Sequence, residues 1–315
     1  MYTNGNYAVR WFGKNLKLQK RAFRVNEELI PEFPDSIDLK ITNKCSWGCP
    51  YCHESSTPFG MSFDLEKTKE ILSQLPELPI EIAIGGGDIL DEPKVKDLIV
   101  WLEERGNRTR ATVNIKDILE RRKSVNSLLS ETEAIGVSMD KLPVFLKDWD
   151  NKDSMRATLL GGDDILPKGT GIYVIHIIAG IFPYQDLEEL FLSCEFPILV
   201  LGYKQWGRAK NTPLPKDLDK FRETLADLIL NMKKTEYDQF LKCNVIGFDN
   251  LALEQLDIRS LLPEDEWQSI YMGDEGTHSM YIDAVNGEFA KTSRSEERVS
   301  WNSIGLIDYF KSLRI

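Results

Sequence analysis

The stretch Lys44–His53 reads K-C-S-W-G-C-P-Y-C-H and holds three of the five cysteines of this 315-residue chain. Cys45, Cys49 and Cys52 give the spacing C-x3-C-x2-C on one short loop. Three thiolates can hold three corners of a cubane iron–sulfur cluster. Because no fourth cysteine lies nearby in the sequence, one iron of such a cluster would be open to a substrate or cofactor. The spacing therefore predicts a cluster that does more than transfer electrons.

Two other interpretations of this loop stay open. His53 directly follows Cys52 and could complete the four ligands of a structural zinc site. Adjacent ligands are awkward in tetrahedral geometry, and no second C-x2-C pair follows. Cys49 and Cys52 could instead form a thioredoxin-like redox pair, which leaves Cys45 without a role.

Composition limits the class of protein. The net charge of −11 argues against a general nucleic-acid surface, because such a surface needs clustered Lys and Arg. No apolar signal core is seen at the N-terminus, and the longest apolar run, Gly171–Phe182, is too short to cross a bilayer. Cys194 and Cys243 lie in apolar contexts, which favour burial. An odd, grouped set of cysteines does not fit a disulfide framework, so we expect a reducing cytoplasm.

From Ser36 onward, strand and helix patterns alternate along the chain. Ser36–Thr42 alternates strictly between apolar and polar residues, as a strand with one apolar face does. The other expected strands are Glu81–Ile84, Arg110–Lys116, Ala134–Met139, Ile172–Gly180, Pro197–Gly202, Asn244–Phe248 and Ser279–Val285. The expected helices are Asp64–Gln74, Pro93–Arg105, Ile118–Ser130, Asp186–Ser193, Lys216–Lys233 and Trp301–Leu313.

Repeated βα units predict an α/β fold with a parallel sheet. We expect a partial (β/α)6-type TIM barrel, which could extend toward (β/α)8, over residues 36–293. Residues 1–35 would form a small N-terminal β-hairpin extension, and residues 294–315 a C-terminal helix packed on the barrel. In such barrels the chemistry lies at the C-terminal ends of the strands, where the cysteine loop falls.

Two segments each allow two interpretations. The hairpin, expected from Tyr7–Phe12 and Leu16–Phe23, would cap the bottom of the barrel. Its basic and aromatic residues could instead dock an acidic partner. Asp148–Gly169 is the least patterned stretch and is expected to be either a lid or an irregular helix with loops.

A glycine run, Gly85-Gly86-Gly87-Asp88, follows the second barrel strand about one βα unit after the cysteines. Glycine lets a backbone approach a ligand closely. Together with the cysteine loop, this run resembles the signature of the radical S-adenosylmethionine (SAM) superfamily, in which this strand ends in Gly-Gly-Glu. The stretches C-H-E-S-S-T-P-F-G, V-L-G-Y-K-Q-W-G-R and F-D-N-L-A-L-E-Q-L are similar to a branch of that superfamily without an assigned substrate. The resemblance covers about Ser36 to Ser293.

The resemblance implies an enzyme with one [4Fe–4S] cluster, held by Cys45, Cys49 and Cys52. In that superfamily, SAM binds the open iron, and its reductive cleavage gives a 5′-deoxyadenosyl radical that abstracts hydrogen from a substrate. The glycine run would hold the amino group of SAM. Asp88 is one methylene shorter than the usual Glu, which keeps the charge but changes the reach.

Further cofactor contacts are implied at the ends of other strands. Ser138 and Asn114 end the fourth and third strands, and either could contact the ribose or methionine part of SAM. Val174–Pro183, which includes His176, loosely matches the fifth-strand segment that packs on adenine, although a core histidine is an alternative. The remaining implied contact is Tyr51, the aromatic residue before the last cysteine. His53 could tune the cluster through a hydrogen bond to a sulfur.

The resemblance leaves the substrate open. It implies a reducing partner such as flavodoxin or ferredoxin, and a peptide, a protein side chain or a nucleotide-type small molecule as substrate. Neither a membrane nor extended nucleic acid is expected as a partner. A zinc-stabilised, non-enzymatic binding protein remains the alternative. Charged and aromatic residues at the late strands could line a substrate pocket or face solvent; they are Lys204, Arg208, Asp249, Tyr281 and Asp283.

Overall fold

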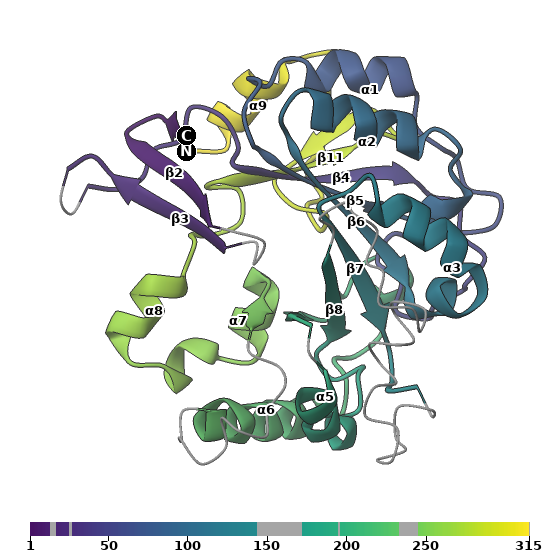
Figure 1. Ribbon diagram of the computed structural model, residues 1–315, viewed down its shortest axis with the longest axis vertical. Coiled ribbons are helices and arrows are strands. Elements are labelled where there is room, and N and C mark those ends of the chain that lie inside the picture. Colours follow the sequence, from purple (N-terminus) through teal and green to yellow (C-terminus); the bar gives the residue numbers. More distant parts are fainter. Residues whose placement is uncertain (13–16, 25–26, 144–171, 195, 233–244, 315) are drawn as a thin grey trace.

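The computed structural model describes residues 1–12, 17–24, 27–143, 172–194, 196–232 and 245–314 (Figure 1). The unpatterned stretch Asp148–Gly169 and the cysteine at position 243 lie outside the described residues. No helix in the described part of the chain is both long and apolar enough to cross a bilayer.

A ten-stranded sheet forms the centre of the described structure, in the order β10-β9-β8-β7-β6-β5-β4-β11-β12-β13. Neighbouring strands pair in parallel from β10 to β11, and β12 and β13 are antiparallel additions. The parallel strands are β4 (Ser36–Thr42), β5 (Glu81–Gly86), β6 (Arg108–Asn114), β7 (Ala134–Met139), β8 (Ile172–Ile178), β9 (Ile198–Leu201), β10 (Ile246–Phe248) and β11 (Ser279–Asp283). The antiparallel strands are β12 (Glu288–Ala290) and β13 (Val299–Ser300).

The sheet is a partial barrel, as the sequence predicts. Strands β10 and β11 add the further parallel strands of the expected extension, but the described strands do not pair across the gap between them. Instead, short helices that the sequence analysis missed fill the connection from β10 to β11 (Figure 1). The α-helices are α1 (Leu65–Leu72), α2 (Val95–Glu104), α3 (Ile115–Leu129), α5 (Leu187–Ser193), α6 (Leu218–Met232), α7 (Asn250–Gln255), α8 (Glu264–Ile270) and α9 (Leu306–Ser312).

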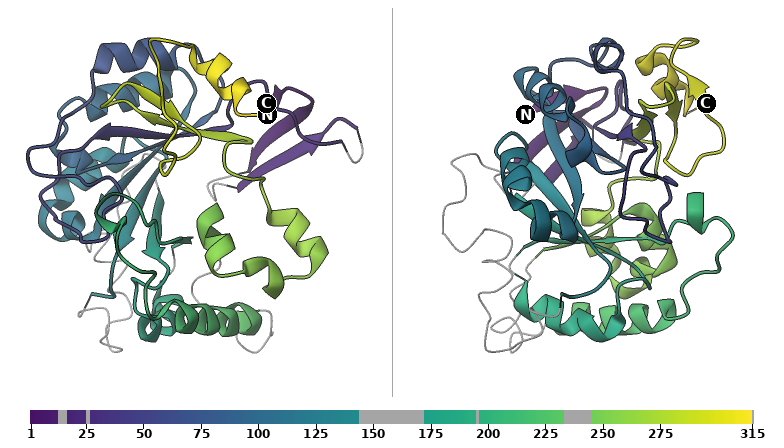
Figure 2. Two further views of the ribbon diagram at one scale, coloured as in Figure 1. Left: turned by 180° about the vertical axis from the view of Figure 1, so that it is seen from behind. Right: turned by 90° about the vertical axis from the view of Figure 1, so that its right-hand side faces the viewer.

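The two faces of the sheet differ in polarity. Ile37, Leu39 and Ile41 of β4 are 0–1% exposed and belong to the main hydrophobic cluster, on the side that helices α1 to α3 cover (Figures 1 and 2). Asp38 alternates with them and points to the inner face. It remains exposed although β4 is flanked by β5 and β11. The inner face of the sheet is therefore open to water at Asp38, whereas Lys40 and Thr42 of the same strand are buried.

The N-terminal residues form a separate three-stranded antiparallel sheet. The expected hairpin is confirmed as β2 (Tyr7–Phe12) and β3 (Lys17–Ala22), and β1 (Tyr2–Asn4) adds a third strand that the sequence pattern did not reveal. A buried polar cluster ties this sheet to the barrel. Tyr7 donates a hydrogen bond to Asp35 Oδ2 at 2.7 Å, and Lys20 Nζ lies 2.9 Å from the same oxygen.

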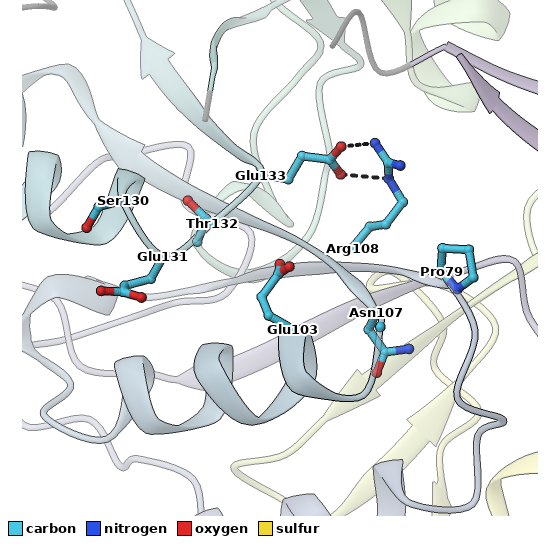
Figure 3. Close-up of a pocket in the computed structure, with 9 residues that line it drawn as sticks. Pro79, Glu103, Asn107, Arg108, Ser130, Glu131, Thr132 and Glu133 are labelled. Atoms are coloured by element: carbon cyan, nitrogen blue, oxygen red, sulfur yellow. Dashed lines mark hydrogen bonds and ion pairs between the residues drawn. The ribbon is translucent and has the colours of Figure 1, made fainter. Parts of the chain in front are cut away.

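This small sheet lies at the N-terminal ends of the barrel strands, as the capping interpretation expects. Trp11 Nε1 donates to the carbonyl of Pro79, which precedes β5, and the Arg108 guanidinium at the start of β6 lies 4.3 Å from the Trp11 ring centroid. A pocket of about 490 Å³ opens at this same end, where Arg108 also pairs with Glu133 (Figure 3). The residues that line this pocket lie near the N-terminal ends of strands, away from the cysteine loop.

We expect Asp35→Asn to lower the free energy of unfolding by about 3–5 kcal/mol at pH 7, because it leaves Lys20 buried and unpaired. Burial alone would raise the pKa of Asp35, but hydrogen bonds from His278, Tyr7 and Asn4 and the charge of Lys20 hold it below its ordinary value. A carboxylate with a lowered pKa stabilises the fold fully above its unfolded pKa, about 3.9, and progressively less below it.

Urea unfolding between pH 7 and pH 3 measures both effects. The difference between the wild type and Asp35→Asn should shrink as the pH falls below about 4. Asp64→Asn is the matched control, because Asp64 is an exposed N-cap of α1 and asparagine caps equally well. A stability difference that is small at pH 7, or that grows with acid, would contradict this account of the cluster.

Candidate functional site

The cysteine loop follows β4 at the C-terminal edge of the sheet, where the sequence places it. Its ends are held together because Cys45 N–H donates to the Thr57 carbonyl and Thr57 N–H to the Asn43 carbonyl, both at 2.9 Å. The thiols of Cys45, Cys49 and Cys52 are free and partly exposed. Three reduced thiols are therefore presented from one loop at the end of the barrel where TIM-type enzymes carry their chemistry.

The environment of the loop raises the pKa of two of its groups. Burial raises the pKa of the Cys45 thiol; the backbone of Trp47 lowers it, and Asp88 and the other two thiols raise it further. Burial also raises the pKa of Tyr51, helped by hydrogen bonds to Cys49 and to Asp140, which directly follows β7. Tyr51 thus bridges the cysteine loop and a second strand end, a contact that the sequence did not indicate.

The glycine run lies directly against the base of the cysteine loop. Gly87 N–H donates to the Thr42 carbonyl and Asp88 N–H to the Lys44 carbonyl, each at 2.7 Å. A Cβ atom on Gly86 would lie 2.4 Å from the Thr42 carbonyl oxygen, and one on Gly87 would lie 2.2 Å from that of Lys44. These two glycines are therefore required for the close approach of the backbones. Gly85 differs, because a Cβ there would meet no atom within 4 Å.

Asp88 is already engaged within the protein. Its Oδ1 accepts a hydrogen bond from Leu90 N–H at 3.1 Å, and its Oδ2 pairs with the Arg121 guanidinium. Arg121 also pairs with Asp117 of the same helix and lies 5.8 Å from the Trp47 ring centroid. The shorter side chain thus joins the second strand end to helix α3 and to the cysteine loop. Both carboxylate oxygens of Asp88 are therefore engaged by partners within the protein.

The three weaker candidates, Asn114, Ser138 and His176, share one cross-strand row. Asn114 pairs in register with Ser138, and Ser138 with His176. All three are partly exposed on the inner face. The side-chain oxygen of Asn114 caps α3 by accepting from Lys116 N–H at 3.0 Å, so only its amide NH₂ is available to a ligand. The structure brings together residues that lie far apart in the sequence.

His176 lies flat against the neighbouring strand. A Cβ atom on Gly136 of β7 would come within 2.2–2.8 Å of three atoms of the His176 ring. Burial and the nearby charge of Arg110 lower the pKa of His176 to about 4. The imidazole is therefore neutral at pH 7 and can offer a hydrogen bond or a flat surface, but no positive charge.

A buried ionic network that the sequence analysis missed holds the exit of the cysteine loop. Lys40 Nζ lies 2.9 Å from Glu54 Oε2 and 2.9 Å from Asp283 Oδ2. Tyr281 donates to Glu54 Oε1 at 3.1 Å, and His53 Nε2 lies 3.2 Å from the same oxygen. The alternation of β4 places Lys40 on the inner face. Its partners are too distant in the sequence to be identified from pattern.

Other charged residues gather further down the inner face. Although the Asp38 side chain contacts water, the protein atoms around it on the inner face partly desolvate the carboxylate and raise its pKa to about 6; Lys204 lowers this pKa, and Glu81, Glu275 and Asp249 raise it. Asp249 is partly used, because it caps α7 by accepting from Ala252 N–H at 2.7 Å. Lys204 donates to the Ser293 hydroxyl at 3.0 Å. Asp38 is therefore electrostatically coupled to charged residues from several distant parts of the chain.

The residues present fit an iron–sulfur cluster better than a single zinc ion. His53, the proposed fourth zinc ligand, is paired with Glu54. Two buried donors of the loop, Trp47 Nε1 and Ser56 Oγ, have no hydrogen-bond partner among the described residues. Soft thiolates on a loop that also carries unpaired hydrogen-bond donors suit a sulfide-containing group.

Comparison with known proteins shows the fold. No protein-family model and no curated protein matches the chain. Among solved structures, SuiB of Streptococcus suis bound to the precursor peptide SuiA superposes with a TM-score of 0.59 at 16% identity, over 89% of this chain and 65% of that one. Native anSMEcpe with bound AdoMet and the Cp18Cys peptide gives a TM-score of 0.53 at 14% identity, over 83% of this chain and 75% of that one. The chain thus spans 65% of the length of the SuiB chain that it matches.

We expect Gly136→Ala to lower the free energy of unfolding by about 1–3 kcal/mol, because the added methyl overlaps the His176 ring. In a His176→Ala background the same change should cost much less, since the obstructing ring is gone. A double-mutant cycle by urea denaturation measures this coupling. Additive costs would show that the ring does not pack on Gly136.

Proposed function

We propose that this chain is a radical SAM enzyme with one [4Fe–4S] cluster. The observation that carries the proposal is the set of three free thiols, Cys45, Cys49 and Cys52, on one loop that packs against the glycine run Gly85–Asp88. The fold supports it, because SuiB and anSMEcpe are themselves radical SAM enzymes. When bound, the cluster and SAM supply a 5′-deoxyadenosyl radical that removes hydrogen from a substrate.

The protein's own residues bind and orient the two groups. The three thiolates would hold three irons, and Trp47 Nε1 and Ser56 Oγ would be donors available to the cluster. Backbone carbonyls of Gly85 and Gly86 would accept hydrogen bonds from the amino group of SAM. The Asn114 amide and the Ser138 hydroxyl lie in one row with the neutral His176, which suits contact with the ribose and adenine. Tyr51 joins the cysteine loop to the end of β7 through its hydrogen bond with Asp140.

The substrate class that we favour is a peptide or protein side chain, and a nucleotide-type small molecule is the second candidate. Two solved structures with a similar fold, SuiB and anSMEcpe, hold peptides. The polar inner face around Asp38 and Lys204 suits a side chain that carries hydrogen-bonding groups. A flavodoxin or ferredoxin would supply the electron. The reduced thiols are in keeping with a cytoplasmic location.

We expect Cys49→Ala to lose most of its iron and all SAM-dependent formation of 5′-deoxyadenosine, because a cluster gripped at two corners is not retained. The measurement is anaerobic reconstitution, iron analysis and product assay with dithionite as reductant. The wild type should hold about four irons and be brown. Cys194→Ala is the matched control, since Cys194 is buried at the end of α5 and should change neither result.

Other outcomes decide against the proposal. Normal SAM cleavage by Cys49→Ala would refute the cluster assignment. A colourless wild-type protein that holds one zinc would support the alternative, a zinc-stabilised binding protein.

We expect Gly85→Ala to weaken SAM binding roughly tenfold or more, because its methyl group would fill the open space beside the glycine run. Since no protein atom lies within 4 Å of that methyl, stability should change by no more than about 0.5 kcal/mol, and iron content should stay at the wild-type level. Anaerobic calorimetry measures the SAM affinity, with urea denaturation as the control. Wild-type affinity in a normally folded variant would remove the glycine run from the SAM site.

A further inference from the structure

A turn that is distant in the sequence lies against the cysteine loop. After β9 the chain forms a short 3₁₀ turn, Gly207–Ala209. Arg208 N–H donates to the Cys52 carbonyl at 3.0 Å, Nε donates to the Cys49 carbonyl at 2.9 Å, and Nη1 donates to the Ser56 carbonyl at 2.7 Å. One residue therefore binds three carbonyls of the loop, two of which belong to the cysteines.

The residue before it makes this contact possible. Gly207 has a φ of +59°, in the left-handed region. A Cβ atom there would lie 2.2 Å from the His53 carbonyl oxygen and 2.8 Å from that of Cys52. The turn thus approaches the loop more closely than any residue with a side chain would allow.

The loop has little structure of its own to replace these bonds. Within it, Cys52 N–H donates to the Cys49 carbonyl at 3.2 Å and Ser55 N–H to the Cys52 carbonyl at 3.3 Å. Both are longer than the bonds from Arg208. The guanidinium spans the third cysteine, because it joins the carbonyls of Cys49 and Ser56 on either side of it.

We propose that Arg208 is the positioning residue of the cysteine loop, and that it holds the loop in its cluster-binding shape while placing a fixed positive charge beside the cluster. This inference rests on the proposed function, since it presumes a cluster on the three thiols. The planar guanidinium fork of arginine reaches two carbonyls at once. A cation next to a cluster favours the reduced form, which carries the extra negative charge.

Three variants separate geometry from charge. Arg208→Gln removes both the charge and the fork, and Arg208→Lys keeps the charge but not the fork. Gly207→Ala prevents the close approach of the turn to the cysteine loop but keeps the arginine at position 208. Arg222→Gln is the matched control, because Arg222 likewise donates from Nε to a backbone carbonyl, at 2.8 Å, but to Leu256 at the end of α7.

The experiment uses the full-length reconstituted protein. It measures iron loss to a chelator and the midpoint potential of the cluster, followed by electron paramagnetic resonance. We expect iron loss to be about tenfold faster or more in Arg208→Gln, Arg208→Lys and Gly207→Ala. We expect the ratio of reduced to oxidised cluster at a fixed potential to fall roughly tenfold in Arg208→Gln only, a shift of about 59 mV for a one-electron couple. Arg222→Gln should match the wild type in both.

The outcomes are distinguishable. A wild-type protein without a cluster overturns the proposed function itself. A wild type with a cluster, together with an Arg208→Gln variant of unchanged iron loss and potential, overturns only the role of Arg208. If Arg208→Gln does not fold, Arg208→Lys and Gly207→Ala still decide, because wild-type iron retention in both would refute the positioning role.

Discussion

The candidate site depends most on the two ion pairs that the ammonium group of Lys40 makes. This ammonium group is buried between the carboxylates of Glu54 and Asp283, 2.9 Å from each, and so joins the first barrel strand to the exit of the cysteine loop and to β11. Burial alone would lower the pKa of Lys40, but the two carboxylates raise it above its ordinary value, so the charge is retained. Losing one partner of such a group leaves a buried charge uncompensated, which costs about 3–5 kcal/mol.

Like the ion pairs of Lys40, the other contacts of the cysteine loop come from several strands and turns. The cysteine loop contains no helix and no strand. Its shape therefore depends on contacts from β4 and β11 and from the residues that follow β5 and β9. An open barrel can supply them, because the C-terminal ends of parallel strands meet at one edge. On the inner face below this edge, Asp38 remains in contact with water although it lies in the middle of the sheet.

The sequence predicted the elements with strong periodicity and the residues with a distinctive spacing. Strands β4 and β7 have their expected bounds, and the cysteine loop and glycine run lie together as expected. What could not be predicted depends on long-range contacts. Nothing local pairs Lys40 with Glu54, directs Arg208 to the loop carbonyls, or places Asp140 on Tyr51. Helices α7 and α8, which are six and seven residues long, were not predicted. The particular site residues remain predictions from the motif.

The central claim is that three thiols hold a cluster whose fourth iron is free to bind SAM. Mössbauer spectroscopy of the ⁵⁷Fe-reconstituted wild type, recorded with and without SAM, tests it most directly. We expect about four irons per chain, one of which changes its spectrum when SAM is added while the other three do not. A spectrum that SAM leaves unchanged, or a protein that holds no cubane cluster, would contradict it.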